Sequence, residues 1–227
     1  MRMKSLIVGD VKFQFKYGFY FVYAVFTIVY AAIIYVLPNS WKETAATIMI
    51  FSDPAAMGLF FMGAIVLLEK SERVLNSIAV SPVSSKEYIL SKVVSLGFIS
   101  TIVGLIIALS AESNNFLIVS FGIFMGSSVF TLVGLIIAAN AKSLNQFIVA
   151  TVPIEIICFL PPIWYLFGYD KAFMLMHPGC IIVRFISGNS DNLFMLTAVL
   201  LIWIVAIYSI AYKNIEKMFQ QAGGTKL

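Results

Sequence analysis

Long apolar stretches without a charged residue divide this chain into regular segments. Four stretches of 19 to 29 residues contain no Asp, Glu, Lys or Arg, and two more are interrupted by a single acid, Asp53 or Glu155. Because about 20 mostly apolar residues cross a bilayer as a helix, each stretch predicts one membrane span. The six expected helices cover residues 19–37, 46–69, 93–111, 116–139, 146–167 and 193–212.

The composition excludes several other classes of protein. Of the 227 residues, 61% are hydrophobic and 11% are charged, and the mean hydropathy is +0.97. A soluble domain carries about 25% charged residues, so this chain has too little polar surface for an ordinary soluble enzyme, a disordered segment or a nucleic-acid binder. The expected fold class is an all-α polytopic membrane protein, with residues 1–227 forming a single transmembrane domain.

The distribution of positive charge predicts the orientation in the membrane. Six crossings place both termini on the same side of the bilayer, and cytoplasmic loops carry an excess of Lys and Arg. With the termini inside, twelve of the 15 Lys and Arg residues fall on the inner side. We therefore expect a multi-pass protein of the cell membrane with both termini in the cytoplasm. The three cations left outside are Lys42, Lys171 and Arg184.

Two segments on the inner side have their own helical patterns. Residues 1–17 place apolar residues at four-residue spacing between lysines, which predicts an amphipathic helix on the inner membrane surface. Residues 69–92 hold seven charges and a short helix with an apolar face, which Pro82 ends. Ser84 and Glu87 have the spacing of a capping box that starts the next helix. This inner loop is therefore expected to be a helix–turn–helix.

Small residues and turn signals mark three further features. Gly122 and Gly126 form a GxxxG pair, which predicts close helix packing. Residues 168–191 are too apolar for an exposed loop and too short to span, so a re-entrant or interfacial pair of short helices is expected there, separated by a turn at residues 177–179. Residues 213–227 are polar and predict a cytoplasmic tail.

Two acids lie within the apolar stretches. Asp53 precedes Pro54, and this pair predicts that the second span begins there as a capped helix, after an outer lead-in. Glu155 lies in a span that contains three prolines, which favours a face lining protein or water. Glu155 is either a hydrogen-bonded packing residue or a carboxylate in a translocation path for cationic or amphipathic substrates. Tyr23 and Tyr30 on the first span either line the same path or pack against neighbouring helices.

Residues for catalysis or metal binding are scarce. His177 is the only histidine, and Cys158 and Cys180 do not form a metal-binding spacing. The chain also lacks a GxxxxGK(S/T) phosphate-binding loop. We therefore expect no catalytic, cofactor-binding or metal site in this chain.

The inner loop resembles that of a known family. It reads EKSERVL at 69–75, VSPVS at 80–84 and EYIL at 87–90, followed by Lys92. This pattern resembles the loop after the second span of type-two ATP-binding-cassette (ABC) transporter permeases. The amphipathic N-terminal helix, the six spans and the short pair before the last span are similar to that family as well. His177-Pro178, Arg184 and Gly188 resemble its proline–arginine–glycine pattern.

The resemblance implies a six-span half-transporter permease of an exporter, which provides the path for a lipophilic drug, antibiotic or peptide. It implies a dimer with a second copy or a sister permease, and a separate ATPase subunit that holds ATP and magnesium. This chain would then be a transport subunit without a cofactor of its own, in contact with the lipid bilayer and not with nucleic acid. The short helix after the second span, the coupling helix, docks on the ATPase in such permeases. By position, the docking residues are Glu72, Arg73, Val74, Leu75, Ile78 and Pro82.

Two other classes stay open at this point. One is a proton- or ion-coupled secondary transporter that uses Glu155 and Asp53. The other is a membrane sensor or accessory protein that transports nothing. A neighbouring gene for an ATPase would favour the ABC permease, whereas transport that follows a proton gradient without ATP would favour the secondary transporter.

Overall fold

The computed structural model describes residues 2–79, 81–113, 115–169 and 171–222, and these residues form helices without any strand. Six helices in this part of the chain are long and apolar enough to cross a membrane, which confirms the predicted all-α polytopic fold. The second span is one continuous rod made of α3 (Asn39–Ile50), η1 (Phe51–Ala55) and α4 (Met57–Ser71). The other five spans are α2 (Phe19–Val36), α6 (Ser85–Ser110), α7 (Phe116–Asn140), α8 (Leu144–Leu166) and α10 (Leu193–Ala222). The shorter helices are α1 (Arg2–Lys16), α5 (Val74–Ala79), η2 (Ala172–Met176) and α9 (Pro178–Ile186).

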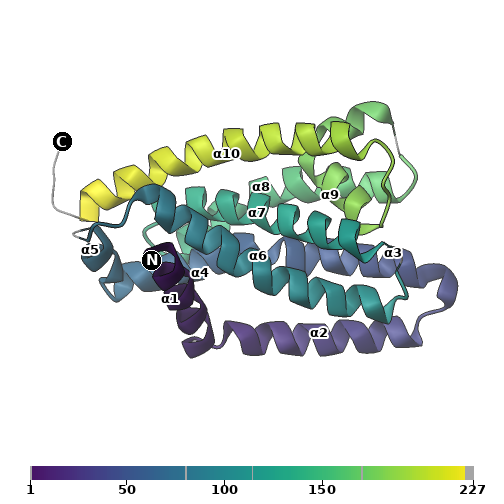
Figure 1. Ribbon diagram of the computed structural model, residues 1–227, viewed down its shortest axis with the longest axis horizontal. Helices are drawn as coiled ribbons and strands as arrows, with labels where there is room; N and C mark the ends of the chain where they lie inside the picture. The colour runs from purple at the N-terminus through teal and green to yellow at the C-terminus, as the bar shows by residue number, and fades with distance from the viewer. Residues whose placement is uncertain (1, 80, 114, 170, 223–227) are drawn as a thin grey trace.

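Helix α7 lies at the centre of the bundle. It contacts α4, α6, α9 and α10, and most of its residues from Gly126 to Ala138 are buried. The long helices run along the long axis of the molecule, with α2 and α10 at opposite edges (Figure 1). The same view places α1 and α5 together at one end of the bundle, here called the α5 end, and α9 toward the other.

A sharp corner separates α1 from the first span. Gly18 has φ +76°, a left-handed conformation that glycine adopts without steric cost. Beyond this corner α1 lies across the α5 end and contacts α2 and α6. Gln14 of α1 is buried and donates a hydrogen bond to the Ser95 hydroxyl at 3.1 Å, whereas Phe15 points outward. Helix α1 thus meets the bundle partly through polar side chains.

The structure of the second span contradicts the prediction that a capped helix begins at Asp53. The helix does not begin at this residue: α3 starts at Asn39, and the rod continues through the π-helical turn η1 into α4. Pro54 lies inside that turn. Because proline cannot donate to the helical ladder, the extra residue of a π turn accommodates the missing bond locally and the rod continues.

Two short helices, η2 and α9, occupy the segment before the last span. Helix α9 is buried along almost its whole length and packs on α7 and α8. A Cβ atom at Gly122 would lie 2.7 Å from the Phe185 Cβ atom, and one at Gly126 would lie 2.8 Å from the Ile182 Cγ2 atom. The GxxxG pair of α7 is therefore the surface on which α9 rests.

Candidate functional site

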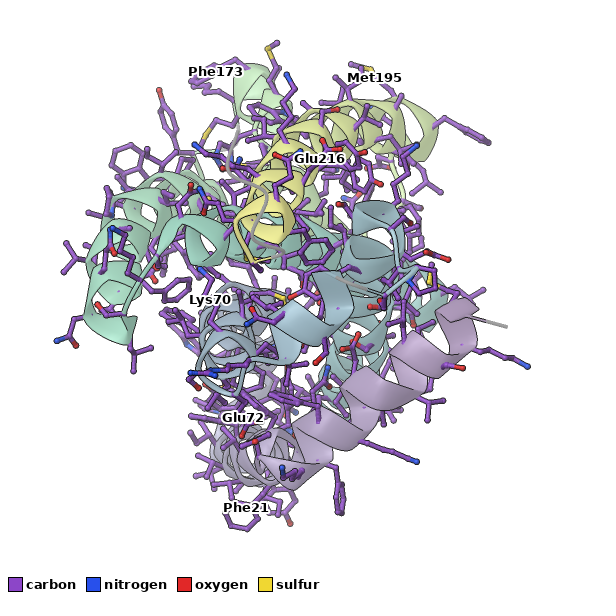
Figure 2. The ribbon with its side chains drawn as sticks, turned by 90° about the vertical axis from the view of Figure 1, so that its left-hand side faces the viewer. Phe21, Lys70, Glu72, Phe173, Met195 and Glu216 are labelled. Carbon is purple, nitrogen blue, oxygen red and sulfur yellow. The ribbon has the colours of Figure 1, made fainter. Side chains whose placement is uncertain are left out.

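The α5 end contains the segment that the family resemblance singles out. Figure 2 looks onto this end, with Lys70 and Glu72 labelled. Ser84 and Glu87 form the predicted capping box: the Ser84 backbone N–H donates to Glu87 Oε2 at 2.9 Å, and the Glu87 N–H donates to Ser84 Oγ at 3.3 Å. The inner loop is therefore a helix–turn–helix, as the sequence predicted.

One side of α5 is covered by the chain itself. Leu75 is only 2% exposed and belongs to the hydrophobic core, while Val74 and Ile78 are half-buried. The reason is the last helix, because α10 runs past α5 and contacts it together with α4. Leu75, expected in an ATPase groove, thus points into this chain's own core.

The outward side of α5 is polar. Glu72, Arg73, Asn76, Ser77 and Pro82 are all exposed. Arg73 has φ +58° at the corner between α4 and α5, so its side chain leaves the bundle at the turn. Of the six predicted docking residues, Glu72, Arg73 and Pro82 are therefore open to a partner, and Asn76 and Ser77 extend the same face.

A buried ionic cluster joins α1, α4 and α6. Lys92 of α6, 1% exposed, donates to Asp10 Oδ1 of α1 at 2.6 Å and forms a second ion pair with Glu69 of α4. The Tyr88 hydroxyl donates to the other oxygen of Glu69 at 2.6 Å. A buried charge is tolerated only when it is paired and hydrogen-bonded. One ammonium group therefore holds three helices together at the point where the chain turns into and out of α5.

Two further contacts extend this cluster to the rest of the α5 end. The Tyr88 ring packs edge-on against Phe219 of α10, with centroids 5.2 Å apart. The Tyr17 hydroxyl, directly after α1, donates to the Glu72 carboxylate. Helices α1, α4, α6 and α10 are thus linked around α5.

Sequence reasoning missed this cluster. It counted Glu69 and Lys92 among the seven charges of the loop and did not single out Asp10. A usable signal was present, since Glu69 directly follows the last leucines of a span and Lys92 directly precedes the apolar run of the next span. Charges in such positions need partners when they are buried.

Lys70 has a different function from its neighbour Glu69. Its ammonium donates to the carbonyl oxygens of Ala138, Ala139 and Ala141 at 2.8, 3.0 and 2.8 Å. These carbonyls belong to the last turn of α7 and the residue that follows it, where helical partners are lacking and the helix dipole is negative. Lys70 therefore caps α7 from the end of α4.

Two of the predicted path residues, Tyr23 and Tyr30, lie on the side of α2 that packs against the bundle. Tyr23 is buried, lies 3.4 Å from the Ser100 hydroxyl and packs edge-on against Phe61. Tyr30 lies near Asp53 of the π turn. Asp53 is 7% exposed, and its Oδ2 atom has no hydrogen-bond partner among the described residues.

Glu155 lines a groove on the other side of the π turn. This groove has a volume of about 360 Å³ and lies between α8 and the second span, with Ser52, Phe60 and Phe159 in its walls. Neither Tyr23 nor Tyr30 lines it. The structure therefore separates the three path candidates, with Glu155 in an open groove and the tyrosines within the bundle. No group of three His, Cys, Asp or Glu side chains that could hold a metal occurs in the part of the chain that the structure describes.

At the opposite end, His177 joins α8 to α9. Its Nδ1 atom accepts the Gly179 N–H at 3.2 Å and caps α9, and its ring lies near the backbone of Ile157 in α8. The Ile157 carbonyl lacks its helical donor, because residue 161 is a proline. Burial lowers the pKa of His177, consistent with a neutral ring that accepts at Nδ1, and raises the pKa of Cys180 to about 12.

The fold and these features define a multi-span membrane protein with a structured helical turn at one end. Comparison with known families identifies the class. The chain matches the fluoroquinolones export permease protein family over residues 1–220, and it belongs to that family.

Two similar relatives are fluoroquinolones export permease proteins of Mycobacterium tuberculosis, from strains CDC 1551 / Oshkosh and ATCC 25618 / H37Rv. Each is 33% identical to this chain over 86 residues. The aligned segment covers 37% of this chain and 36% of each relative.

Proposed function

We propose that this chain is the membrane-spanning permease subunit of an ATP-driven exporter that works with a separate ATPase subunit. Membership of an export permease family supports the transport role. In this proposal both termini and the α5 end face the cytoplasm, where most of the Lys and Arg residues lie. A second copy or a sister permease completes the membrane part.

One observation carries the coupling part of the proposal: Glu69, near the end of the helix that leads into α5, is a member of the Lys92 cluster. The ion pairs of Lys92 reach α1 and α4 from α6. A partner that presses on Arg73, Asn76 and Ser77 would therefore displace three helices together. A flexible loop at this position would absorb the same displacement.

The Glu155 groove supports a drug-sized substrate. Its volume of about 360 Å³ falls within the range of small-molecule sites, about 300–1,000 Å³. Apolar and aromatic walls suit a lipophilic ring system, and one carboxylate suits a basic amine on it. We propose that the substrate is an amphipathic aromatic antibiotic of the fluoroquinolone kind, which is what the names of the two relatives indicate.

Drug accumulation in cells that produce the permease and its neighbouring ATPase tests this proposal. A fluorescent fluoroquinolone is expected to accumulate less in these cells than in cells with a Walker-motif ATPase variant. Arg73→Glu, which reverses a charge on the outward side of α5, is expected to reduce both export and co-purification of the ATPase at least tenfold. Lys171→Glu makes the same change of charge at the opposite end and serves as the control. Full export and full ATPase binding by Arg73→Glu would contradict the docking proposal.

A proton-coupled carrier is the second candidate, because buried Asp53 has one unpartnered carboxylate oxygen. The same cells distinguish the two mechanisms. Export that stops when a protonophore collapses the gradient, and persists in the ATPase variant, would favour the carrier. Export that requires the ATPase and survives the protonophore would favour the ABC permease.

A further inference from the structure

A small polar pocket at the α5 end belongs neither to the α5 face nor to the Glu155 groove. Its volume is about 210 Å³, and it lies between the ends of α4, α7 and α10 and the turn that leads from α7 to α8. Its polar walls come from Lys70, Asn140, Lys142, Asn214, Lys217 and Gln221, and none of its lining residues is acidic.

The walls of the pocket are held in place by hydrogen bonds. The Asn140 amide donates to the Asn214 side-chain oxygen at 2.7 Å and joins α7 to α10. The Lys142 backbone N–H donates to the Gln146 side chain at 2.9 Å, which fixes the turn into α8. Lys70 uses its ammonium protons on the carbonyl oxygens of α7 and so contributes charge to one wall without being free to bind.

Lys142 and Lys217 supply the cations that are free to bind. Neither takes part in any ion pair among the described residues. Glu216, the residue before Lys217, is exposed and hydrogen-bonds with Tyr212 on its own helix. Three positive side chains around one pocket without an acid in its walls favour an anion, and amide side chains supply additional donors.

The position of the pocket along the axis of α10 indicates a lipid headgroup as its ligand. Lys217 follows the first residue of α10 by 24 positions, which is about 36 Å along a helix. The hydrocarbon core of a bilayer is about 30 Å thick, so the Lys217 ammonium lies at headgroup level. Next to Lys142, α8 exposes Leu144 and Ile148, along which an acyl chain can lie.

We propose that Lys142 and Lys217 bind the phosphate group of an anionic phospholipid from the leaflet at the α5 end. Each ammonium group near an anionic headgroup strengthens binding about fivefold. Removing both is therefore expected to weaken binding roughly 30-fold, which corresponds to about 2 kcal/mol. The pocket shares no lining residue with the outward side of α5 or with the Glu155 groove.

Native mass spectrometry of the purified full-length chain tests the proposal. The probes are phosphatidylglycerol, phosphatidylcholine and inorganic phosphate, each titrated into the detergent-solubilised protein. We expect phosphatidylglycerol to remain bound preferentially and the Lys142→Gln/Lys217→Gln variant to lose that preference. Lys4→Gln/Lys12→Gln removes the same charge from the exposed side of α1 at the same end and is expected to retain it.

Each outcome has a definite meaning. Loss of preferential binding in the pocket variant but not in the α1 variant, with no displacement of lipid by inorganic phosphate, supports the phospholipid site. Binding of inorganic phosphate that depends on both lysines and displaces the lipid would assign the pocket to a free anion and overturn the lipid source. Equal lipid retention by the pocket variant and the unchanged protein would overturn the site. A melting temperature close to that of the unchanged protein in lipid-free detergent shows that the variant is folded.

Discussion

Replacing Lys92 with methionine tests whether the buried cluster holds the α5 end together. Methionine keeps an unbranched side chain of similar length but removes the ammonium, and it leaves the carboxylates of Asp10 and Glu69 buried without a cation. Removing one partner of a buried ion pair costs about 3–5 kcal/mol. Because Lys92 is 1% exposed and serves two carboxylates, we expect a loss of unfolding free energy in that range.

The neutral counterpart of this variant separates charge from packing. In Asp10→Asn/Glu69→Gln/Lys92→Met no charge remains in the cluster, so the penalty for unpaired carboxylates disappears. This triple variant is expected to recover most of the stability that Lys92→Met loses. Lys86→Met, at an exposed position of the same helix, is the control and should lose less than about 1 kcal/mol.

Unfolding in mixed micelles, followed by circular dichroism as the SDS fraction rises, measures these free energies. Limited trypsin digestion adds a local readout, because α1 carries Lys12 and Lys16, and only the single variant leaves the Asp10 carboxylate of α1 charged without its cation. We expect faster cleavage in α1 for Lys92→Met than for the triple variant. The reasoning would be refuted if Lys92→Met lost no more stability than Lys86→Met, or if the triple variant were as unstable as Lys92→Met.

Three other perturbations are expected to change stability in the same assay. Gly122→Ala places a Cβ atom 2.7 Å from the Phe185 Cβ atom and should cost about 1–3 kcal/mol, whereas Gly9→Ala, with nothing within 4 Å, should be neutral or stabilising. Lys70→Met removes the cap of α7 and should cost about 1–3 kcal/mol. Burial lowers the pKa of His177 below 6.5 in the folded protein, so the unfolded chain binds more protons than the folded protein near that pH. The free energy of unfolding should therefore fall as the pH drops through 6.5, and it should level off below the pKa of the folded protein. His177→Asn, which can still cap α9, should flatten that dependence.

The parts of the fold that depend on local patterns could be predicted from the sequence. The charge-free run from 17 to 41 corresponds to α2, and the structure confirms that the apolar runs form six spans. The capping box at Ser84 was also predictable, because both its residues lie within four positions. Apolar length and cap spacing are properties of adjacent residues, so no knowledge of the tertiary structure was needed.

The parts that depend on distant partners could not be predicted in this way. Lys92 pairs with residues that are 82 and 23 positions away, and no local pattern specifies which acids arrive beside it. The orientation of α5 has the same cause, because six residues do not determine which side α10 will cover. Asp53 shows a third limit: an Asp-Pro pair suits both a helix start and a π turn, and the packing of the whole rod selects the turn.

The distribution of helical hydrogen bonds indicates where this bundle can change shape. At the α5 end the helix termini are capped by Lys70 and Ser84, and Lys92 joins three helices. Helix α8 contains three prolines, each of which removes one ladder hydrogen bond, and the π turn interrupts the regular ladder of the second span. The Glu155 groove lies between these two irregular elements. In the proposed mechanism, a displacement that enters at α5 would pass through this braced region to the two helices that are least restrained by their own backbones, and these helices would open and close around the substrate.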